Sequence, residues 1–229
     1  DNVRFSKGYP EKIGGWQKSS GNSFLGTCRA LHPWVSLDRD QFVGVGTHLK
    51  YYIDEGGFYN DITPLRETTA AGAATFAATN GSDLLTVTDT NHGAVVNDFV
   101  TFSGAASLGG LITATVLNQE YQITEVVSTS QYKIQARQAD TPIYDIVVDG
   151  VLTPTYVNAN SSDPGNGGSS VVAAYQVNTG LDITVSGAGW GAGTWGRGTW
   201  GSSSTDPIVS NTIRLWSHVN FGEDLLINF

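Results

Sequence analysis

The sequence predicts an all-β protein: antiparallel propeller-type sheets or meanders, with a small inserted module that is β-barrel-like or sandwich-like. Three observations predict this class. Short runs of β-branched and aromatic residues recur along the chain, 28 glycines punctuate its 229 residues, and no window has the apolar spacing of an amphipathic helix. Because only 14% of the residues are charged, turns and half-buried strands are favoured over solvated helices.

The first strands are predicted within residues 1–41. Residues 3–5 form a short strand that is followed by a turn at Lys7-Gly8. A second pair of strands is expected within 25–37, where Pro33 marks an edge strand or a bend because it cannot donate to a sheet ladder.

The stretch 42–64 has the clearest strand pattern. It reads FVGVGTHLKYYIDEGGFYNDITP, with three apolar or aromatic runs that are separated at 46–47 and at 54–57 and ended by Pro64. Aromatic and β-branched residues at this density, cut by glycine and aspartate, indicate an antiparallel meander. Such a unit cannot bury both of its faces alone, so we interpret it as most of one propeller blade.

After Pro64 the composition changes. Residues 68–79 are rich in alanine and threonine, as expected of a linker or a strand of small residues. A hairpin over 143–158 is predicted to turn at Asp149-Gly150, and SSDPGNGGSS at 161–170 is predicted to be a loop. Between these segments, runs bounded by Asn, Asp, Gly or Ser predict strands at 84–90, 95–104, 117–127 and 132–137.

The segment GWGAGTWGRGTWG at 189–201 places Trp190, Trp195 and Trp200 at a constant odd spacing. Because an odd spacing puts successive indoles on opposite faces of a flat strand, we expect a looped ribbon. These three tryptophans are the candidate ligand-binding residues, since indole faces suit pyranose rings. The alternative is that they pack over neighbouring glycine backbone.

We predict three segments: first propeller-type sheets at 1–67, an inserted β module at 68–160, and the Gly/Trp-rich ribbon with a return to propeller-type strands at 161–229. The last segment ends with a strand at 213–216, a turn at 220–222 and a strand from Leu225, like the start of another blade. The chain lacks methionine and ends within a predicted strand, so we expect a piece of a longer polypeptide.

Composition argues against several classes of site. The formal net charge of −9 and the absence of a basic run argue against a nucleic-acid-binding surface. The single Cys28 excludes an internal disulfide framework, and we expect it to be a small buried core residue. No run approaches the about 18 apolar residues of a membrane helix, so no membrane insertion is expected.

Catalytic and metal motifs are not apparent in the sequence. The four histidines show no HxH or HExxH spacing, so neither a metal nor another cofactor is expected, and turn or edge positions are predicted for them: His32, His48, His92 and His218. No G-x-S-x-G motif occurs. A pair of glycosidase carboxylates could come from Asp38, Asp40, Asp54, Glu55 and Asp61. Because these residues fall in predicted turns, where acidic residues serve solvation, we predict that the protein is not an enzyme; a polysaccharide-degrading enzyme remains a rival hypothesis.

Several segments, taken in order, resemble virion structural proteins of tailed bacteriophages, and in particular the β-propeller-containing tail tube or nozzle proteins of short-tailed phages. They cover about two-thirds of the chain in separate patches: NVRFSKGYPEKIGGW, VGVGTHLKYYIDEGGFYNDITPLR, TNHGAVVNDFVTFSGA, GWGAGTWGRGTWG and LWSHVNFGEDLLINF.

This resemblance implies a component of the phage tail that forms a ring of copies of itself, typically sixfold, around the DNA exit channel. It also implies contacts with adjacent tail and adaptor proteins, and genomic DNA that passes through without specific binding. A negative wall suits such a conduit because it repels phosphate. The alternative hypothesis is a carbohydrate-binding host-adhesion module of a virion, built around the three tryptophans of the ribbon.

Overall fold

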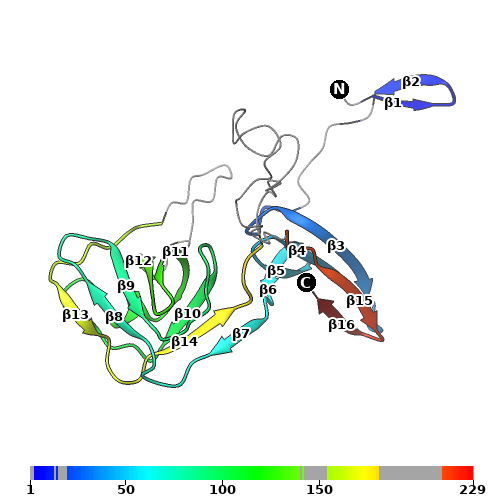
Figure 1. The fold of residues 1–229 in the computed structure, drawn as a ribbon. Coiled ribbons are helices and arrows are strands. Elements are labelled where there is room, and N and C mark those ends of the chain that lie inside the picture. The colour runs from blue at the N-terminus through cyan, green and yellow to red at the C-terminus, as the bar shows by residue number, and fades with distance from the viewer. Residues whose placement is uncertain are drawn as a thin grey trace, which may run out of the picture.

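The computed structural model describes residues 3–12, 14, 20–139, 141, 154–180 and 213–228. In these residues the predicted all-β class is confirmed, because the strands form antiparallel sheets and one helical turn, α1 (Ala114–Leu117), accompanies them (Figure 1). Thr113 caps this turn by accepting a hydrogen bond from the backbone N–H of Val116.

The predicted three-run meander is found as β4 (Gln41–Thr47), β5 (Tyr51–Glu55) and β6 (Phe58–Asp61), and one further strand, β3 (Cys28–Val35), joins it in a four-stranded antiparallel sheet whose successive strands are neighbours. The pair of strands predicted within 25–37 is corrected, because this segment forms the single strand β3. The turn after β5 is shorter than predicted: Gly56 and Gly57 suffice because both adopt positive φ, so Asp54 and Glu55 remain in the strand. Residues 46–47 likewise continue β4 and do not interrupt it.

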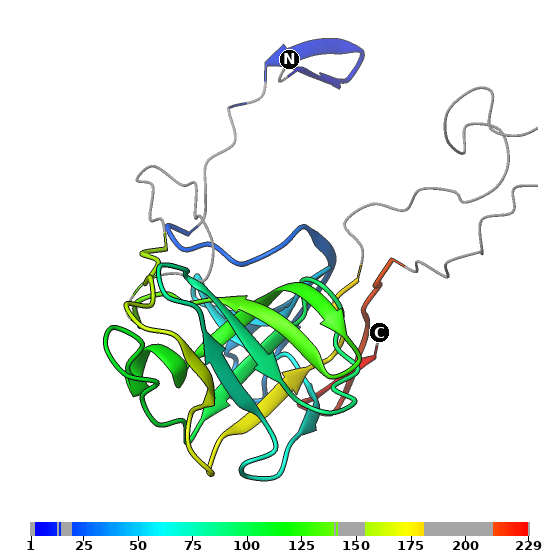
Figure 2. The same ribbon diagram turned by 60° about the vertical axis from the view of Figure 1, so that its left-hand side comes forward.

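A second sheet has eight antiparallel strands and is open, since its first and last strands do not pair with each other in the described residues (Figures 1 and 2). From edge to edge the strands are β13 (Asp163–Asn166), β8 (Thr75–Ala78), β9 (Leu84–Thr88), β12 (Gln131–Gln135), β11 (Glu120–Ser128), β10 (Phe99–Ser103), β14 (Val172–Gln176) and β7 (Leu65–Thr68).

Four predicted strands of this sheet are found as β9, β10, β11 and β12 with shifted ends, and the small-residue stretch supplies β8. The predicted loop at 161–170 is corrected in part, because β13 lies within it. As an edge strand, β13 tolerates Pro164, whose nitrogen cannot donate. The hairpin turn predicted at 149–150 lies outside the described residues.

The chain enters and leaves the eight-stranded sheet at one place. Pro64 precedes β7 and Val177 follows β14, and the Val177 N–H donates to the Pro64 carbonyl at 3.0 Å. The sheet therefore includes strands that precede and follow the predicted module at 68–160. The division of the chain into three segments stays a prediction. Its core is aromatic and aliphatic, with Phe76 and Phe102 in edge-to-face contact at 4.8 Å between centroids.

Two further hairpins lie near the ends of the chain. The N-terminal hairpin, β1 (Val3–Ser6) and β2 (Tyr9–Lys12), has the turn predicted at 7–8 and stands apart from both sheets (Figures 1 and 2). The C-terminal hairpin, β15 (Ser217–Phe221) and β16 (Asp224–Asn228), packs near β3 of the four-stranded sheet.

The first strand of the C-terminal hairpin starts later than the predicted 213–216, because Trp216 is inserted into a core instead of pairing. Its indole packs edge-to-face on Tyr51 with centroids 4.9 Å apart and donates to the Thr47 carbonyl at 2.7 Å. A Cβ at Gly46 would clash with this indole, so glycine permits the close approach. The turn falls accordingly at Gly222-Glu223, after the predicted position.

Trp216→Ala should lower the free energy of unfolding by about 3 kcal/mol or more, since it removes a buried indole and its hydrogen bond. Denaturant titration measures this change. Leu226→Ala on the exposed face of the same hairpin serves as the control and should cost less than about 0.5 kcal/mol. Equal effects of the two substitutions would contradict the packing described above.

Candidate functional site

Of the residues predicted to bind a ligand or carry out chemistry, the candidate carboxylates fall within the described structure. Trp190, Trp195 and Trp200 lie outside the described residues, so their role stays a prediction. Asp38, Asp40 and Glu55 are exposed, whereas Asp54 and Asp61 bond nearby backbone and Asp61 also binds Lys50. Asp54 accepts from the Gly57 N–H at 2.8 Å, and Asp61 accepts from the Thr63 N–H at 2.9 Å.

Cys28 is half-buried at the start of β3, less enclosed than the core position predicted for it. Burial raises the pKa of its thiol. Among the described residues no group of three or more His, Cys, Asp or Glu could hold a metal ion. Within the same residues, no helix is both long and apolar enough to cross a bilayer.

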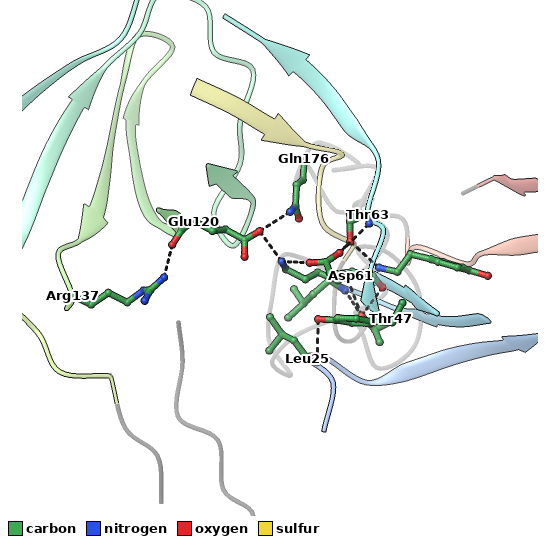
Figure 3. Close-up of polar contacts among 11 residues, drawn as sticks. Leu25, Thr47, Asp61, Thr63, Glu120, Arg137 and Gln176 are labelled. Atoms are coloured by element: carbon green, nitrogen blue, oxygen red, sulfur yellow. Dashed lines mark hydrogen bonds and ion pairs between the residues drawn. The ribbon is translucent and has the colours of Figure 1, made fainter. Parts of the chain in front are cut away.

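The most constrained polar site joins the two large sheets. We call Lys50, Asp61, Glu120 and Gln176 the Lys50 junction; Figure 3 labels the last three of these residues. The Lys50 ammonium lies 2.5 Å from Asp61 Oδ2 and 2.7 Å from Glu120 Oε1, and the Lys50 side chain is only 4% exposed. Gln176 donates to the same Glu120 oxygen at 2.5 Å. One lysine from the four-stranded sheet thus binds carboxylates of both sheets.

Local structure fixes each side of the junction. On one side, Thr47 Oγ1 accepts the N–H of Lys50 at 2.8 Å, which closes the turn that aims the lysine inward. On the other side, Arg137 donates to the Glu120 carbonyl at 2.8 Å and holds the start of β11 (Figure 3). The aliphatic and cationic end of Lys50 also lies over the Phe99 ring, with Nζ 4.5 Å from the centroid.

The chemistry of the junction is that of a fixed ion pair. A buried ammonium is tolerated only when opposite charges and hydrogen bonds replace its water, and Lys50 has two carboxylates for this purpose. Each carboxylate is further engaged, Asp61 by Thr63 and Glu120 by Gln176. The arrangement joins the two sheets through charge and hydrogen bonds. The sequence signal for it was a lysine inside the apolar run Leu49–Tyr52.

A second contact joins the C-terminal hairpin to the four-stranded sheet. The rings of His32 and His218 stack 5.4 Å apart, and Trp34 continues the stack beyond His32. His218 Nδ1 and the Tyr51 hydroxyl form a 2.5 Å hydrogen bond, and His32 Nε2 bonds Asn220 Oδ1. Both histidines lie in edge strands, as predicted, but their pairing across the sequence was not foreseen.

Burial dominates the electrostatics of this contact. Desolvation raises the pKa of Tyr51 to about 12, so the phenol stays protonated. Burial and then the neighbouring His32 lower the pKa of His218. His218 Nε2 is buried without a hydrogen-bond partner among the described residues, which also favours the neutral ring.

A pocket of about 530 Å³ opens between the loop 91–94 and the end of strand β11 at 126–129. His92 lies in its wall in the predicted turn. Its Nδ1 accepts from the Ala94 N–H at 3.1 Å, and Nε2 donates to the Ser128 carbonyl at 3.0 Å. Because both ring nitrogens bond backbone, His92 ties its own loop to the end of β11 and has no nitrogen left for a ligand.

Comparisons with known proteins do not identify a family for this chain. No protein-family model matches the chain, and no curated protein matches it. Among solved structures it is similar to the phage phi92 endosialidase, with a TM-score of 0.27 and 12% sequence identity. The match covers 66% of this chain and 18% of the endosialidase chain, so it spans only a small part of that protein. A similarity at this level carries no argument about activity.

Lys50→Met should lower the free energy of unfolding by about 3 to 5 kcal/mol, because it leaves two carboxylates at a buried contact without their counter-charge. Denaturant titration again provides the measurement. The control is Lys133→Met, which removes an exposed 2.8 Å ion pair with Glu125 and should cost less than about 1 kcal/mol. If the two variants are equally stable, the junction does not hold the sheets together.

The depressed pKa of His218 predicts acid sensitivity. The contribution of neutral His218 to the free energy of unfolding is fully present above the ordinary histidine pKa of about 6.5. It is lost as the pH falls through the lower pKa that His218 has in the folded protein. Wild-type protein should therefore lose more unfolding free energy between about pH 7.5 and pH 5 than His218→Gln, which cannot be charged. If wild type and His218→Gln lose the same unfolding free energy in denaturant titrations at the two pH values, protonation of His218 does not destabilise the folded protein.

Proposed function

We propose that this chain is a non-enzymatic structural component of a bacteriophage tail, of the tail tube or nozzle class, and that copies of it form a ring around the DNA exit channel. The observation that carries the proposal is the stacking of one antiparallel sheet on another. The C-terminal hairpin covers one face of the blade-like β3–β6 sheet through Trp216, His218 and Asn220.

Both outer faces of this stack are apolar. Leu31 and Val35 are exposed on β3, and Val219 and Phe221 are exposed on β15. Sheets that bury one face and present a second apolar face are suited to repeated stacking, either as blades of a propeller or between subunits. This property supports an assembly component, and the resemblance of the sequence segments to tail proteins supports the virion as its setting.

The mechanism that we propose is geometric. The Lys50 junction holds the eight-stranded sheet in a fixed orientation on the blade-like sheet, so that this sheet can contact a neighbouring copy or an adjacent tail or adaptor protein. The net charge of −9 suits a channel wall, because like charge keeps DNA from binding as it passes. The copy number is taken from the family resemblance as sixfold.

Negative-stain imaging of the purified protein, together with its mass in solution by light scattering, tests this proposal. We expect closed rings with a central hole and a mass that is an integral multiple of the 24.3 kDa chain. Compact monomers at all accessible concentrations would contradict the ring. Imaging at two salt concentrations controls for non-specific electrostatic association, which salt screens.

A further inference from the structure

The N-terminal hairpin has a face with no partner in the described structure. The register Val3↔Lys12 and Phe5↔Pro10 places these four residues on one face. Phe5 is 78% exposed, and Figures 1 and 2 show the hairpin standing away from both sheets. An isolated two-stranded hairpin is only marginally stable in water, so a partner that covers this apolar face would stabilise it.

The C-terminal hairpin has an exposed face of matching character. Its inner side chains, among them His218, pack against the four-stranded sheet. The register Val219↔Leu226 and Phe221↔Asp224 places the other four residues on the outer face. Phe221 is 77% exposed, so this face is apolar with a carboxylate at its edge.

The two hairpins are opposite in charge. Residues 3–12 contain three basic residues and one acidic residue, whereas 217–228 contain Glu223 and Asp224 and neither lysine nor arginine. On the apolar faces themselves, Lys12 stands at the edge of one and Asp224 at the edge of the other. Neither view shows the two hairpins in contact within one chain (Figures 1 and 2).

We infer that the N-terminal hairpin of one copy docks on the outer face of the C-terminal hairpin of a second copy. Phe5 then covers Phe221 and removes two exposed aromatic rings from water, while Lys12 faces Asp224. The contact is head-to-tail, because it joins different surfaces of the two copies, and such contacts close into rings or extend into filaments. This inference rests on the proposed assembly of copies and names the surfaces that carry it.

A charge-reversal cycle tests the docking. Lys12→Glu and Asp224→Lys, each alone, should weaken self-association about tenfold, because each places like charges at the contact. The double variant K12E/D224K should restore association to within about threefold of wild type, since the pair is rebuilt with its signs exchanged. Sedimentation velocity over a concentration series gives the association constants. Both residues are exposed, and unchanged thermal unfolding verifies that the variants fold.

A general charge effect predicts a different result. Asp224→Lys lowers the net negative charge of the chain, so reduced repulsion between copies would strengthen association instead of weakening it. Glu67→Lys, an exposed substitution with the same charge change on β7, is the matched control and should leave the association constant within about twofold of wild type.

The outcomes separate this inference from the proposed function. If the wild type forms rings and the single reversals associate normally, the docking is wrong, the ring stands, and another partner covers these faces. If the wild type associates through both hairpins into open chains, the docking stands and the ring is wrong. A wild type that stays monomeric overturns both.

Discussion

The structure depends on the burial of one positive charge. Lys50 lies where the four-stranded and eight-stranded sheets meet, and its ammonium is neutralised by Asp61 from one and Glu120 from the other. The chain enters the eight-stranded sheet after Pro64 and leaves it at Val177, and these two residues are hydrogen-bonded to each other. Val177 directly follows Gln176 of the Lys50 junction, so this crossing point lies beside the buried charge. Because an unpaired buried lysine is very costly, few relative orientations of the sheets are allowed. The ion pairs of Lys50 therefore fix the orientation of the two sheets more than they raise the free energy of unfolding.

The contact between the C-terminal hairpin and the four-stranded sheet is of another kind. It consists of stacked rings, with His218 on His32 and the indole of Trp216 on Tyr51. The hydrogen bond from Trp216 to the Thr47 carbonyl fixes how deeply the indole is inserted. The lowered pKa of His218 favours the neutral imidazole, which stabilises the contact. Where the Lys50 junction uses charge, this contact uses aromatic area and hydrogen bonds between neutral groups. Protonation of His218 affects this contact directly, because burial lowers the pKa of that imidazole.

These two contacts leave the molecule with surfaces that its own chain does not cover. The outer face of the C-terminal hairpin and the N-terminal hairpin are both apolar, and their charges are opposite. Because Trp216 fixes the C-terminal hairpin on the four-stranded sheet, the outer face of that hairpin has a constant direction relative to the sheet.

The sequence by itself determined the all-β class, the meander at 42–64 and most strands of the second sheet, because side-chain alternation and turn residues are local signals. It also predicted a turn or edge position for His92, which lies in a turn. Tertiary structure decided the rest. The Lys50 junction and the His32–His218 stack join residues far apart in sequence, and no local pattern encodes such a distance. Strand β13 and the shifted start of β15 depend on a sheet edge and on the insertion of Trp216, which only the folded chain provides.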